Sequence, residues 1–562
     1  MIQSLHLLRS GARCLVAAGL CFPVLASAQT KAPTWQEPPR LVVGIVVDQM
    51  RTDYIYRYWD NFGEGGFKRL VGEGAFLRDA HFNYAPTYTG PGHASVYTGT
   101  TPAHHGIVGN DMFVRATGGG LYCVQDDNAK GVGSTGPTGQ RSPLNLVSGT
   151  IADELELRFA QRSKTIGIAW KDRGAILPVG RTGDAAYWFA GGADGHFATS
   201  TWYMNELPKW VKKFNERGTA AKYLGTTWDL LLPSERYLQP LPDENPYEKP
   251  LTGAATATLP QDLAALFAAS GSNTGLLGYV PGGNTLTTDF ALAALEGEDM
   301  GTDAFTDLLA LSYSAPDYLG HRMGPRALEV EDMYLRLDRE LARLFEELDK
   351  RVGKEHYVVF LTADHGAVDV PEYLKDLKAS AGYVQNQVFV DAVEQELNKR
   401  HGAGAWVRKV ANEQIFLNDS LLDARGLVRA QVQRVVADVL LKQALIAEAL
   451  TADDLVRNTY PTGIRGMIQR GFMPQRSGDV CFAVRPGYFD AGPGPDKQGT
   501  THGSPWNYDT HVPILFMGQG IEPGEVTRRV SITDIAPTIS MLVGMTMPDA
   551  ATGNVVHEVI QR

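Results

Sequence analysis

The sequence predicts an α/β fold, in which a central, mostly parallel sheet is covered by helices on both faces. Three features lead to this prediction. Continuous apolar runs of strand length recur along the chain, amphipathic helical patterns lie between them, and Asp or His residues follow several of the runs directly. A chain of 562 residues, 44% of them hydrophobic, is long enough to bury the core that such a sheet requires.

The first apolar run sets the pattern for the strands. Residues 40–48 read Arg-Leu-Val-Val-Gly-Ile-Val-Val-Asp, which is typical of a central strand that is buried on both faces and ends in a carboxylate. The clearest helical pattern covers residues 327–350, which are charged on one face and apolar on the other. Because ligands bind at the carboxyl ends of parallel strands, we expect a site where the runs end. The other strand-like runs are residues 165–170, 308–312, 357–362 and 512–517.

Two segments, residues 191–300 and 375–470, carry no comparable pattern. We expect them to be insertions that form a cap or rim over the site of a single α/β domain, which spans residues 29–562. The frequent Gly and Pro residues, 60 and 31 in number, suit a loop-rich enzyme of this kind.

Residues 1–28 are typical of a signal peptide. Arg9 and Arg13 precede an apolar run at residues 14–25, and Ala26-Ser-Ala28 has the small residues that signal peptidase requires. The run is too short to span a bilayer, and no later segment of the sequence approaches the ~20 apolar residues that spanning needs. We therefore expect an exported protein, periplasmic or secreted, without a membrane anchor. An uncleaved N-terminal anchor is the alternative.

Charge and cysteine content limit the partners. A formal net charge of -11 argues against nucleic-acid binding, apart from nucleotides as substrates, but does not exclude small anions at a metal site.

Cys123 and Cys481, the cysteines outside the signal peptide, could form a disulfide or remain as two buried thiols. The acidic loop Asp126-Asp-Asn128 could hold a structural calcium ion, and a solvated turn is the alternative. The oligomeric state is left open.

Six carboxylate and imidazole side chains form a candidate metal site. Asp and His without Cys suit zinc or another divalent transition metal, and three of each suffice for two ions with open positions for a substrate. Each residue by itself also has a simpler interpretation as a surface pair, a loop carboxylate or a helix cap. Their joint occurrence after predicted strands is what points to a site. The six residues are Asp48, Asp317, His321, Asp364, His365 and His502.

Thr89 is a candidate nucleophile. The Gly90-Pro-Gly92 segment that follows it is typical of the start of a helix. A hydroxyl there lies at the positive end of a helix dipole, beside free backbone N–H groups, which is a natural site for phosphate. The alternative is that Thr89 merely caps the helix.

Several segments, taken in order, resemble the alkaline phosphatase superfamily. Residues 86–99 look like the nucleophile segment of its threonine branches. These branches include the nucleotide pyrophosphatase/phosphodiesterases and the threonine-type alkaline phosphatases of the PafA/PhoK kind, to which the likeness is greatest. The other segments that carry the resemblance are Asp48-Gln-Met50, residues 104–110, Lys171-Asp-Arg173, residues 317–321, Asp364-His365, His502 and residues 534–538.

The resemblance implies two zinc ions in an alkaline phosphatase-like core. The first would be held by Asp317, His321 and His502. The second would be held by Asp48, Asp364 and His365, with the Thr89 hydroxyl as its fourth ligand.

The resemblance also implies roles for residues around Thr89. Asn110 would donate a hydrogen bond to a phosphoryl oxygen. Thr87 competes with Thr89 as the nucleophile, and we prefer Thr89 because related enzymes place the nucleophile four residues before the histidine that matches His93. The histidines expected to be structural are His93, His104, His105 and His511.

Lys171 and Arg173 bear on the choice of substrate. They follow the predicted strand 165–170 with one residue between them, so in extended geometry both side chains point the same way. A phosphate monoester is a dianion whose extra charge favours such a pair, whereas a diester carries one charge and a bulky group. The resembling alkaline phosphatases have this pair. A solvated basic turn is the alternative.

These observations predict a zinc-dependent alkaline phosphatase that hydrolyses small phosphate monoesters through a phosphothreonine intermediate on Thr89. One alternative is a phosphodiesterase or nucleotide pyrophosphatase on the same two-zinc core. Another is a non-catalytic exported protein that binds phosphate or metal. Sulfate hydrolysis is not expected, because residues 89–93 lack the Cys or Ser and the Arg of the sulfatase signature.

Overall fold

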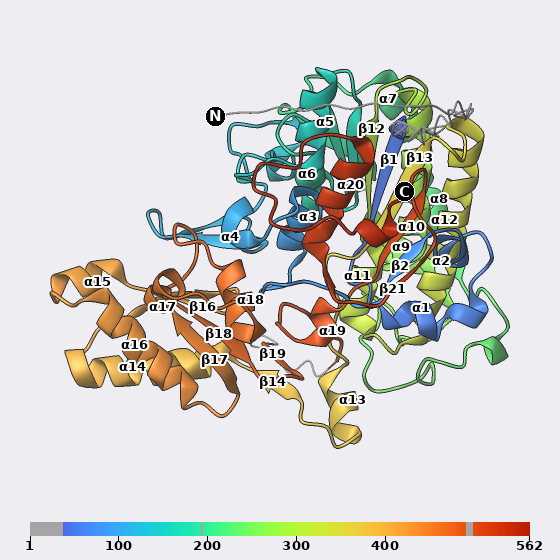
Figure 1. Cartoon of the computed structure of the whole chain (residues 1–562). Helices are drawn as coiled ribbons and strands as arrows, with labels where there is room; N and C mark the ends of the chain where they lie inside the picture. The colour runs from blue at the N-terminus through green and yellow to red at the C-terminus, as the bar shows by residue number, and fades with distance from the viewer. Residues whose placement is uncertain (1–36, 193–194, 491–497, 562) are drawn as a thin grey trace, which may run out of the picture. The chain divides into compact units, whose positions relative to one another are not determined.

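A central sheet of ten strands organises the computed structural model, which describes residues 37–192, 195–490 and 498–561 (Figure 1). The predicted signal peptide lies outside these residues. In spatial order the strands are β21 (Gly524–Val526), β2 (Ala75–Leu77), β20 (Ile514–Gly518), β13 (Tyr357–Thr362), β1 (Leu41–Val47), β12 (Asp307–Tyr313), β7 (Thr165–Ala169), β8 (Ala185–Ala190), β9 (His196–Ser200) and β6 (Gly131–Val132).

Strand β1 lies in the middle of the sheet, parallel to both neighbours. Val43 of β1 pairs with Leu309 of β12 on one side and with Val359 of β13 on the other. Strands β7 and β8 continue the parallel order, whereas β20 and β9 run antiparallel to β13 and β8. All seven residues of β1 are buried, as its continuous apolar run predicts for a strand covered on both faces. The predicted mostly parallel sheet is confirmed.

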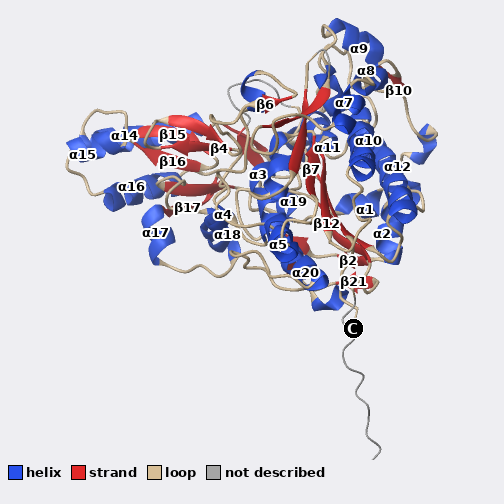
Figure 2. Cartoon of the chain, turned by 90° about the horizontal axis from the view of Figure 1, so that it is seen from above, coloured by secondary structure: helices blue, strands red, loops and turns tan. Residues whose placement is uncertain are grey.

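Helices cover both faces of this sheet (Figure 2). On one side lie α10 (Gly282–Gly297) and α12 (Leu328–Arg351), and on the other lie α3 (Thr89–Thr98), α5 (Ile151–Phe159) and α20 (Ile535–Val543). Helix α12 matches the amphipathic pattern of the sequence, because its apolar side chains are buried while its exposed face carries ion pairs such as Lys350–Glu346.

A second, antiparallel sheet forms within residues 407–484. Its strands, in spatial order, are β15 (Val407–Ala411), β16 (Gln414–Leu417), β18 (Val480–Val484) and β17 (Ile446–Thr451). Helices α14 (Asn386–His401) and α16 (Arg429–Leu441) contribute to its separate apolar cluster around Trp406. This sheet comes largely from the predicted insertion 375–470. The other predicted insertion, 191–300, contributes strand β9 and helix α10 to the central layers.

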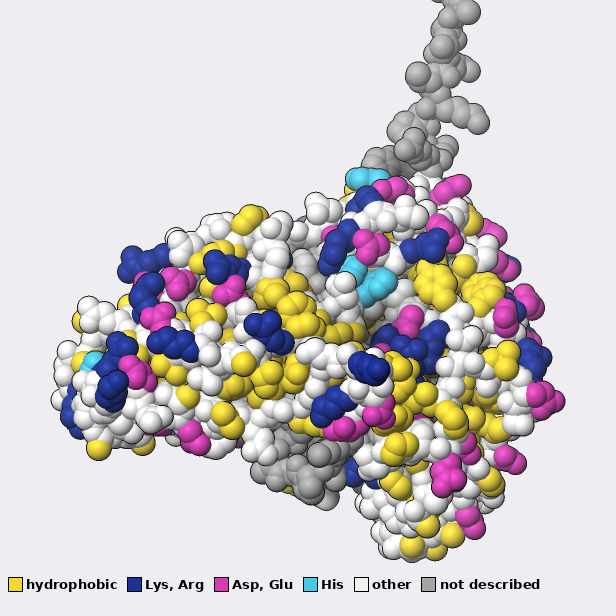
Figure 3. All heavy atoms as spheres, turned by 90° about the horizontal axis from the view of Figure 1, so that it is seen from below, with side chains coloured by type: hydrophobic (Ala, Val, Ile, Leu, Met, Phe, Trp, Pro, Cys, Tyr) yellow, Lys and Arg dark blue, Asp and Glu magenta, His cyan; other side chains and the backbone are white. Residues whose placement is uncertain are grey.

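Five parallel strands, β13, β1, β12, β7 and β8, end at the same edge of the central sheet, so the segments that follow them meet there. Among the described residues, no helix has the length and apolar character needed to cross a membrane. On the face seen in Figure 3, basic and acidic side chains are interspersed.

Candidate metal and phosphate site

The six predicted ligands converge at this edge of the sheet. Asp48 follows β1 directly, and Asp364-His365 follows β13. Helix α11 (Ala315–Met323), which follows β12, places Asp317 and His321 on one face because they are four residues apart. His502 comes from the loop before α19 (Asn507–Thr510). Asp48, Asp364 and His365 are completely buried.

Two overlapping groups of these side chains have the spacing of metal ligands. Asp317, His321 and His502 form one group, and Asp48, Asp317 and His365 form the other; in each group the candidate ligand atoms lie within 4.8 Å of one another. Asp364 lies beside the second group, with its Oδ2 at 3.5 Å from Nε2 of His365. The structure therefore brings all six residues into one cluster, with Asp317 between its two halves.

Backbone carbonyls fix the three imidazole rings. The Nδ1 atoms of His321, His502 and His365 contact the carbonyl oxygens of Thr500, Thr87 and Gly366 at 2.8, 2.7 and 3.0 Å. With Nδ1 donating, Nε2 remains for a metal, as is usual for histidine ligands. Burial lowers the pKa of His502 to about 3 and that of His365 well below its ordinary value. Both rings are therefore neutral at pH 7, as metal ligation requires.

The buried carboxylates lack enough hydrogen-bond donors. Oδ1 of Asp48 and Oδ2 of Asp364 are buried without a hydrogen-bond partner. Burial and the charge of Asp317 raise the pKa of Asp48, and burial and Asp48 raise the pKa of Asp364. Leaving such oxygens unpaired is costly unless a cation compensates them. The cluster thus fits divalent metal ions.

Lys171 supplies part of the positive charge in this cluster. Its Nζ lies 2.6 Å from Oδ2 of Asp48 and 2.5 Å from Oδ2 of Asp317. Although burial alone would raise the pKa of Asp317, the nearby His321 and Lys171 hold it well below its ordinary value.

Thr89 is the first residue of α3, and its hydroxyl faces the cluster. Its Oγ1 lies 3.5 Å from Nε2 of His365 and 3.4 Å from Nη2 of Arg173. Tyr88 occupies the capping position, and no side chain caps the helix, so the alternative role of Thr89 as a cap is not observed. The hydroxyl of Thr87 instead donates to the carbonyl oxygen of Ser504 at 3.1 Å.

Asn110 and Arg173 lie beside this hydroxyl. Oδ1 of Asn110 accepts a hydrogen bond of 2.7 Å from the N–H of Gly90, next to Thr89. The guanidinium of Arg173 donates from Nη1 to the hydroxyl of Tyr122 at 2.9 Å. Both side chains therefore lie next to Thr89.

The expected extended geometry holds for Lys171, which has a φ of -84° and a ψ of 129°, but it is wrong for Arg173. Strand β7 ends at Ala169 and helix α6 (Asp172–Val179) begins at Asp172, so Arg173 is the second residue of a helix. The two side chains diverge: Lys171 turns toward Asp48 and Asp317, and Arg173 turns toward Thr89.

Two hydrogen bonds at the site were not predicted from the sequence. Gln49 has a positive φ of 65° and donates from Nε2 to Oδ1 of Asp317 at 2.6 Å. Tyr88 donates its hydroxyl to Oε2 of Glu413 at 2.9 Å, which joins the segment before Thr89 to the turn between β15 and β16. The position of Gln49, directly after the Asp that ends a predicted strand, could have indicated that it contacts the site. Nothing in the sequence pairs Tyr88 with Glu413.

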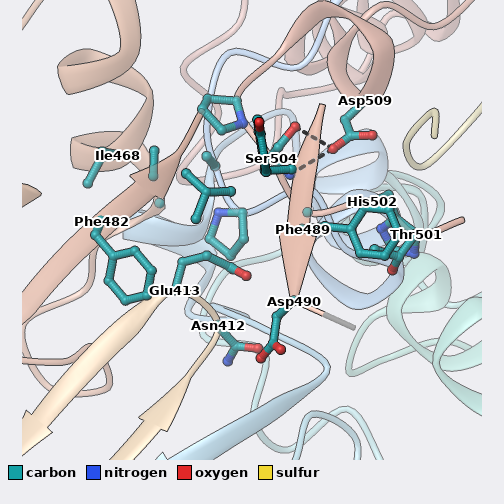
Figure 4. A pocket seen from close by; sticks show the side chains of 18 of the residues that line it. Asn412, Glu413, Ile468, Phe482, Phe489, Asp490, Thr501, His502, Ser504 and Asp509 are labelled. Carbon is teal, nitrogen blue, oxygen red and sulfur yellow. Dashed lines mark hydrogen bonds between the residues drawn. The ribbon is translucent and has the colours of Figure 1, made fainter. Parts of the chain in front are cut away.

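A cavity adjoins the site on the side of His502 (Figure 4). Figure 4 shows His502 and Thr501 on one side of it and Glu413, Phe482 and Ile468 on the other. The second sheet therefore supplies part of the wall next to a predicted metal ligand.

The remaining predicted histidines have varied surroundings. His93 contacts the carbonyl oxygen of Thr89 at 2.9 Å and the hydroxyl of Ser312 at 3.0 Å. His105 is buried against Ser95, and His104 is exposed. His511 stacks on His81, which is 2.7 Å from Asp79, and these three form a further group with ligand-like spacing.

The cysteines and the acidic loop Asp126-Asp-Asn128 can also be placed. Cys123 and Cys481 are both buried free thiols, so of the two alternatives the disulfide is not formed. Burial raises the pKa of the Cys123 thiol to about 12. Asp126 accepts hydrogen bonds from the N–H of Asn128 and the hydroxyl of Ser142, so its carboxylate is already satisfied. A calcium ion there stays a prediction.

Comparison with known proteins adds the following likenesses. The family described as type I phosphodiesterase / nucleotide pyrophosphatase matches residues 42–505. The alkaline phosphatase PafA of Elizabethkingia meningoseptica is 41% identical over 93% of this chain and 95% of its own length. A relative from Myroides odoratus, named calcium-transporting ATPase, is 41% identical over 96% of this chain and 97% of its own length.

Solved structures of PafA have the same fold. Wild-type PafA superposes with a TM-score of 0.89 at 40% identity, over 94% of this chain and 100% of the PafA chain. A PafA variant substituted at one threonine, one asparagine, one lysine and one arginine superposes equally well, with a TM-score of 0.89.

Proposed function

Since this chain belongs to the type I phosphodiesterase / nucleotide pyrophosphatase family, within the alkaline phosphatase superfamily, we propose that it hydrolyses phosphate monoesters at two zinc ions through a phosphothreonine on Thr89. Its relatives over nearly the whole chain make it an enzyme of the alkaline phosphatase type. The observation that carries the finer proposal is the Thr89 hydroxyl, which lies at the start of a helix within 3.5 Å of both a predicted metal ligand and a guanidinium.

The proposed zinc ligands follow the two halves of the cluster. Asp317, His321 and His502 would hold one ion, and Asp48, Asp364 and His365 would hold the other. The neutral rings of His502 and His365, the carboxylates and the absence of thiolates among these residues suit zinc. When bound, zinc would lower the pKa of the Thr89 hydroxyl and stabilise negative charge on the departing oxygen.

The reaction of the chain's own residues then has two steps. Thr89 Oγ1 attacks phosphorus, so that a new P–O bond forms, the ester P–O bond breaks and the alcohol leaves with a proton. Water next attacks the phosphothreonine, which releases inorganic phosphate and restores the hydroxyl. The N-terminus of α3 and the Nδ2 group of Asn110 would donate hydrogen bonds to the phosphoryl oxygens in both steps.

Arg173 and Lys171 support the choice of a monoester. Arg173 lies next to Thr89, where its guanidinium would bind the extra charge of a dianion. Lys171 would be released toward the phosphoryl group once metal cations neutralise Asp48 and Asp317.

The PafA variant supports the roles proposed for Thr89, Asn110, Lys171 and Arg173. Its substituted threonine and asparagine are 21 positions apart and its lysine and arginine two apart, as are Thr89 and Asn110, and Lys171 and Arg173, in this chain. The family description also names phosphodiesterases, so a diester is the alternative substrate. ATP hydrolysis, to which the name of the Myroides relative refers, breaks a P–O bond by the same chemistry, so ATP belongs among the substrates to be tested.

Turnover of p-nitrophenyl phosphate, bis(p-nitrophenyl) phosphate and ATP by the full chain tests this proposal. We expect the monoester to be preferred, chelation to abolish turnover and zinc to restore it. Thr89→Ala should lose at least about 10³-fold in kcat, whereas Thr87→Ala, the matched control, should keep most of its activity. Acid quenching during turnover should leave phosphate on Thr89 in the wild-type chain.

Three results would count against the proposal. They are near-normal turnover by Thr89→Ala, phosphate trapped on Thr87 instead, and a preference for the diester. A chain that binds zinc and phosphate but turns over none of the three substrates would favour the non-catalytic alternative.

A further inference from the structure

Asp79, His81 and His511 form a group that shares no residue with the six-ligand cluster. His81 ends the short strand β3 (Ala80–His81), and His511 is its partner in an isolated antiparallel bridge. Residues directly opposite each other in such a bridge have their side chains on the same face. The two imidazole rings accordingly stack, with their centroids 4.6 Å apart. Oδ1 of Asp79 lies 2.7 Å from Nε2 of His81, which brings the carboxylate to the same place.

The spacing of these side chains suits a metal ion. One candidate ligand atom of each residue lies within 4.8 Å of those of the other two. Two atoms about 2.0 Å from a tetrahedral zinc ion are about 3.3 Å apart, so ligation needs side-chain movements on the order of 1 Å. These movements include a tilt of the His511 ring, because both stacked rings must point a nitrogen at one ion. His511 is only partly buried, which leaves room for the tilt.

Hydrogen bonds to the far nitrogens prepare both rings for ligation. Nε2 of His511 donates to the carbonyl oxygen of Arg78 at 2.8 Å, which leaves Nδ1 for an ion, as is usual for histidine ligands. On His81, the proton that Nε2 shares with Asp79 would move to Nδ1, where the hydroxyl of Thr510 lies 3.3 Å away.

The charge state of His81 also suits a metal ligand. Burial lowers its pKa to about 4, although the hydrogen bond to Asp79 opposes this shift, so the ring is neutral at pH 7. Arg529 contributes to the same shift and is therefore a nearby positive charge that an ion has to overcome. The carboxylate of Asp79 supplies the negative charge that offsets it.

We propose that Asp79, His81 and His511 bind a further zinc ion, which fastens the segment before Thr89 to the segment after His502. Two imidazoles and one carboxylate suit zinc and similar transition metals, whereas calcium and magnesium prefer sets of oxygens alone. Three protein ligands leave the fourth position of a tetrahedral ion to water.

The ion would join two segments whose backbones already pair. The N–H of Val512 donates to the carbonyl oxygen of Ala80 at 3.1 Å, so the two histidines are held opposite each other before any metal binds. The first segment leads to Thr89, and the second follows the loop that carries His502. A metal ion here would therefore stabilise the fold next to the site without contacting the reacting groups.

Zinc counting on the full chain tests this inference. The protein would be stripped with chelator and dialysed to equilibrium against micromolar free zinc, and bound zinc per chain would be measured by elemental mass spectrometry. We expect the wild type to retain one more zinc ion per chain than His511→Ala or Asp79→Asn. The matched control is His104→Ala, which removes an exposed histidine outside the group and should keep the wild-type zinc content.

Circular dichroism of the zinc-free proteins checks that each variant folds. Asp79→Asn keeps the shape of the side chain, so it provides the test if His511→Ala does not fold. None of the variants alters the six-ligand cluster, and the zinc count does not use turnover. A wild-type chain that retains only the ion lost in His511→Ala would support this inference and count against the proposed two-zinc reaction.

Two results would overturn the inference. In the first, the wild type, His511→Ala and Asp79→Asn retain the same number of zinc ions. In the second, His104→Ala loses the additional ion as well, which would place that ion elsewhere.

Discussion

Lys171 and Arg173 are two residues apart, yet they have different partners. Lys171 is buried between two carboxylates of the predicted metal cluster, whereas Arg173 is held by the hydroxyl of Tyr122 and lies next to Thr89. In the proposed reaction Arg173 would already be positioned for a phosphoryl oxygen, whereas Lys171 would become free to move only when other cations occupy the cluster. Of the two, Arg173 should contribute more directly to substrate binding.

The two cations should select monoesters over diesters. We predict that the double variant Lys171→Ala, Arg173→Ala loses about 10²- to 10³-fold in kcat/KM for a monoester, because each side chain compensates charge on the dianion. Loss for the matched diester should stay below about 10-fold, since a diester carries one charge fewer. Equal losses on the two substrates, measured side by side in zinc-containing buffer, would contradict this account of selectivity.

Among the elements, helix α3 approaches the loop after β13 unusually closely. A Cβ atom added to Gly92 would lie 2.4 Å from the carbonyl oxygen of Asp364 and 2.7 Å from its Cβ. These contacts are with a backbone oxygen and a Cβ atom, so a change of side-chain rotamer cannot relieve them. The glycine after Pro91 therefore lets the helix that carries Thr89 pack directly on a predicted metal ligand.

Gly92→Ala should consequently damage the metal site rather than the helix. Alanine favours helix by about 1 kcal/mol over glycine, but the clash would push Asp364 away from His365. We predict weaker zinc retention, seen as faster loss of zinc to a competing chelator, together with reduced turnover. Gly72→Ala in α2 (Phe67–Glu73), where an added Cβ meets nothing within 4 Å, is the control and should behave like the wild type.

For the molecule as a whole, the free energy of unfolding depends on pH through a buried acid of α5 that contacts β7. Glu156 is 4% exposed and accepts a 2.9 Å hydrogen bond from the hydroxyl of Thr165. Burial, aided by the charge of Asp184, raises its pKa to about 7. The folded protein therefore holds a proton that the unfolded chain releases near pH 4, so stability falls as pH rises from there through 7 and stays lower above it.

Glu156→Gln removes this titration and should stabilise the protein at alkaline pH. We expect its free energy of unfolding to exceed that of the wild type by about 2 kcal/mol more at pH 9 than at pH 5. Denaturant unfolding of both proteins at the two pH values measures the difference. The exposed Glu64→Gln should show no such gain, and a Glu156→Gln gain that is the same at both pH values would refute the assignment.

The sequence predicts the central strands well because each is a local apolar run. It predicts most of the cluster because Asp48 follows one such run directly and Asp364-His365 follows another after a single alanine. Helix α10 was missed as part of the central layers since its buried side includes Asn284, Thr287 and Thr288 rather than a clear apolar stripe. The positive φ of Gln49 depends on contacts with Asp317 and Asp364, which are more than 260 positions away. Such contacts leave no local signal.

The hydrogen bond from Tyr88 to Glu413 has a consequence for protein engineering. It is a single half-buried contact that spans 325 positions of sequence and ends one residue from Thr89. Grafting the 407–484 segment from a relative would therefore exchange not only a cavity wall but also a contact next to Thr89. Chimaeras with a short side chain at position 413 should need a compensating change at position 88, and recombination libraries built on this scaffold should keep the two positions together.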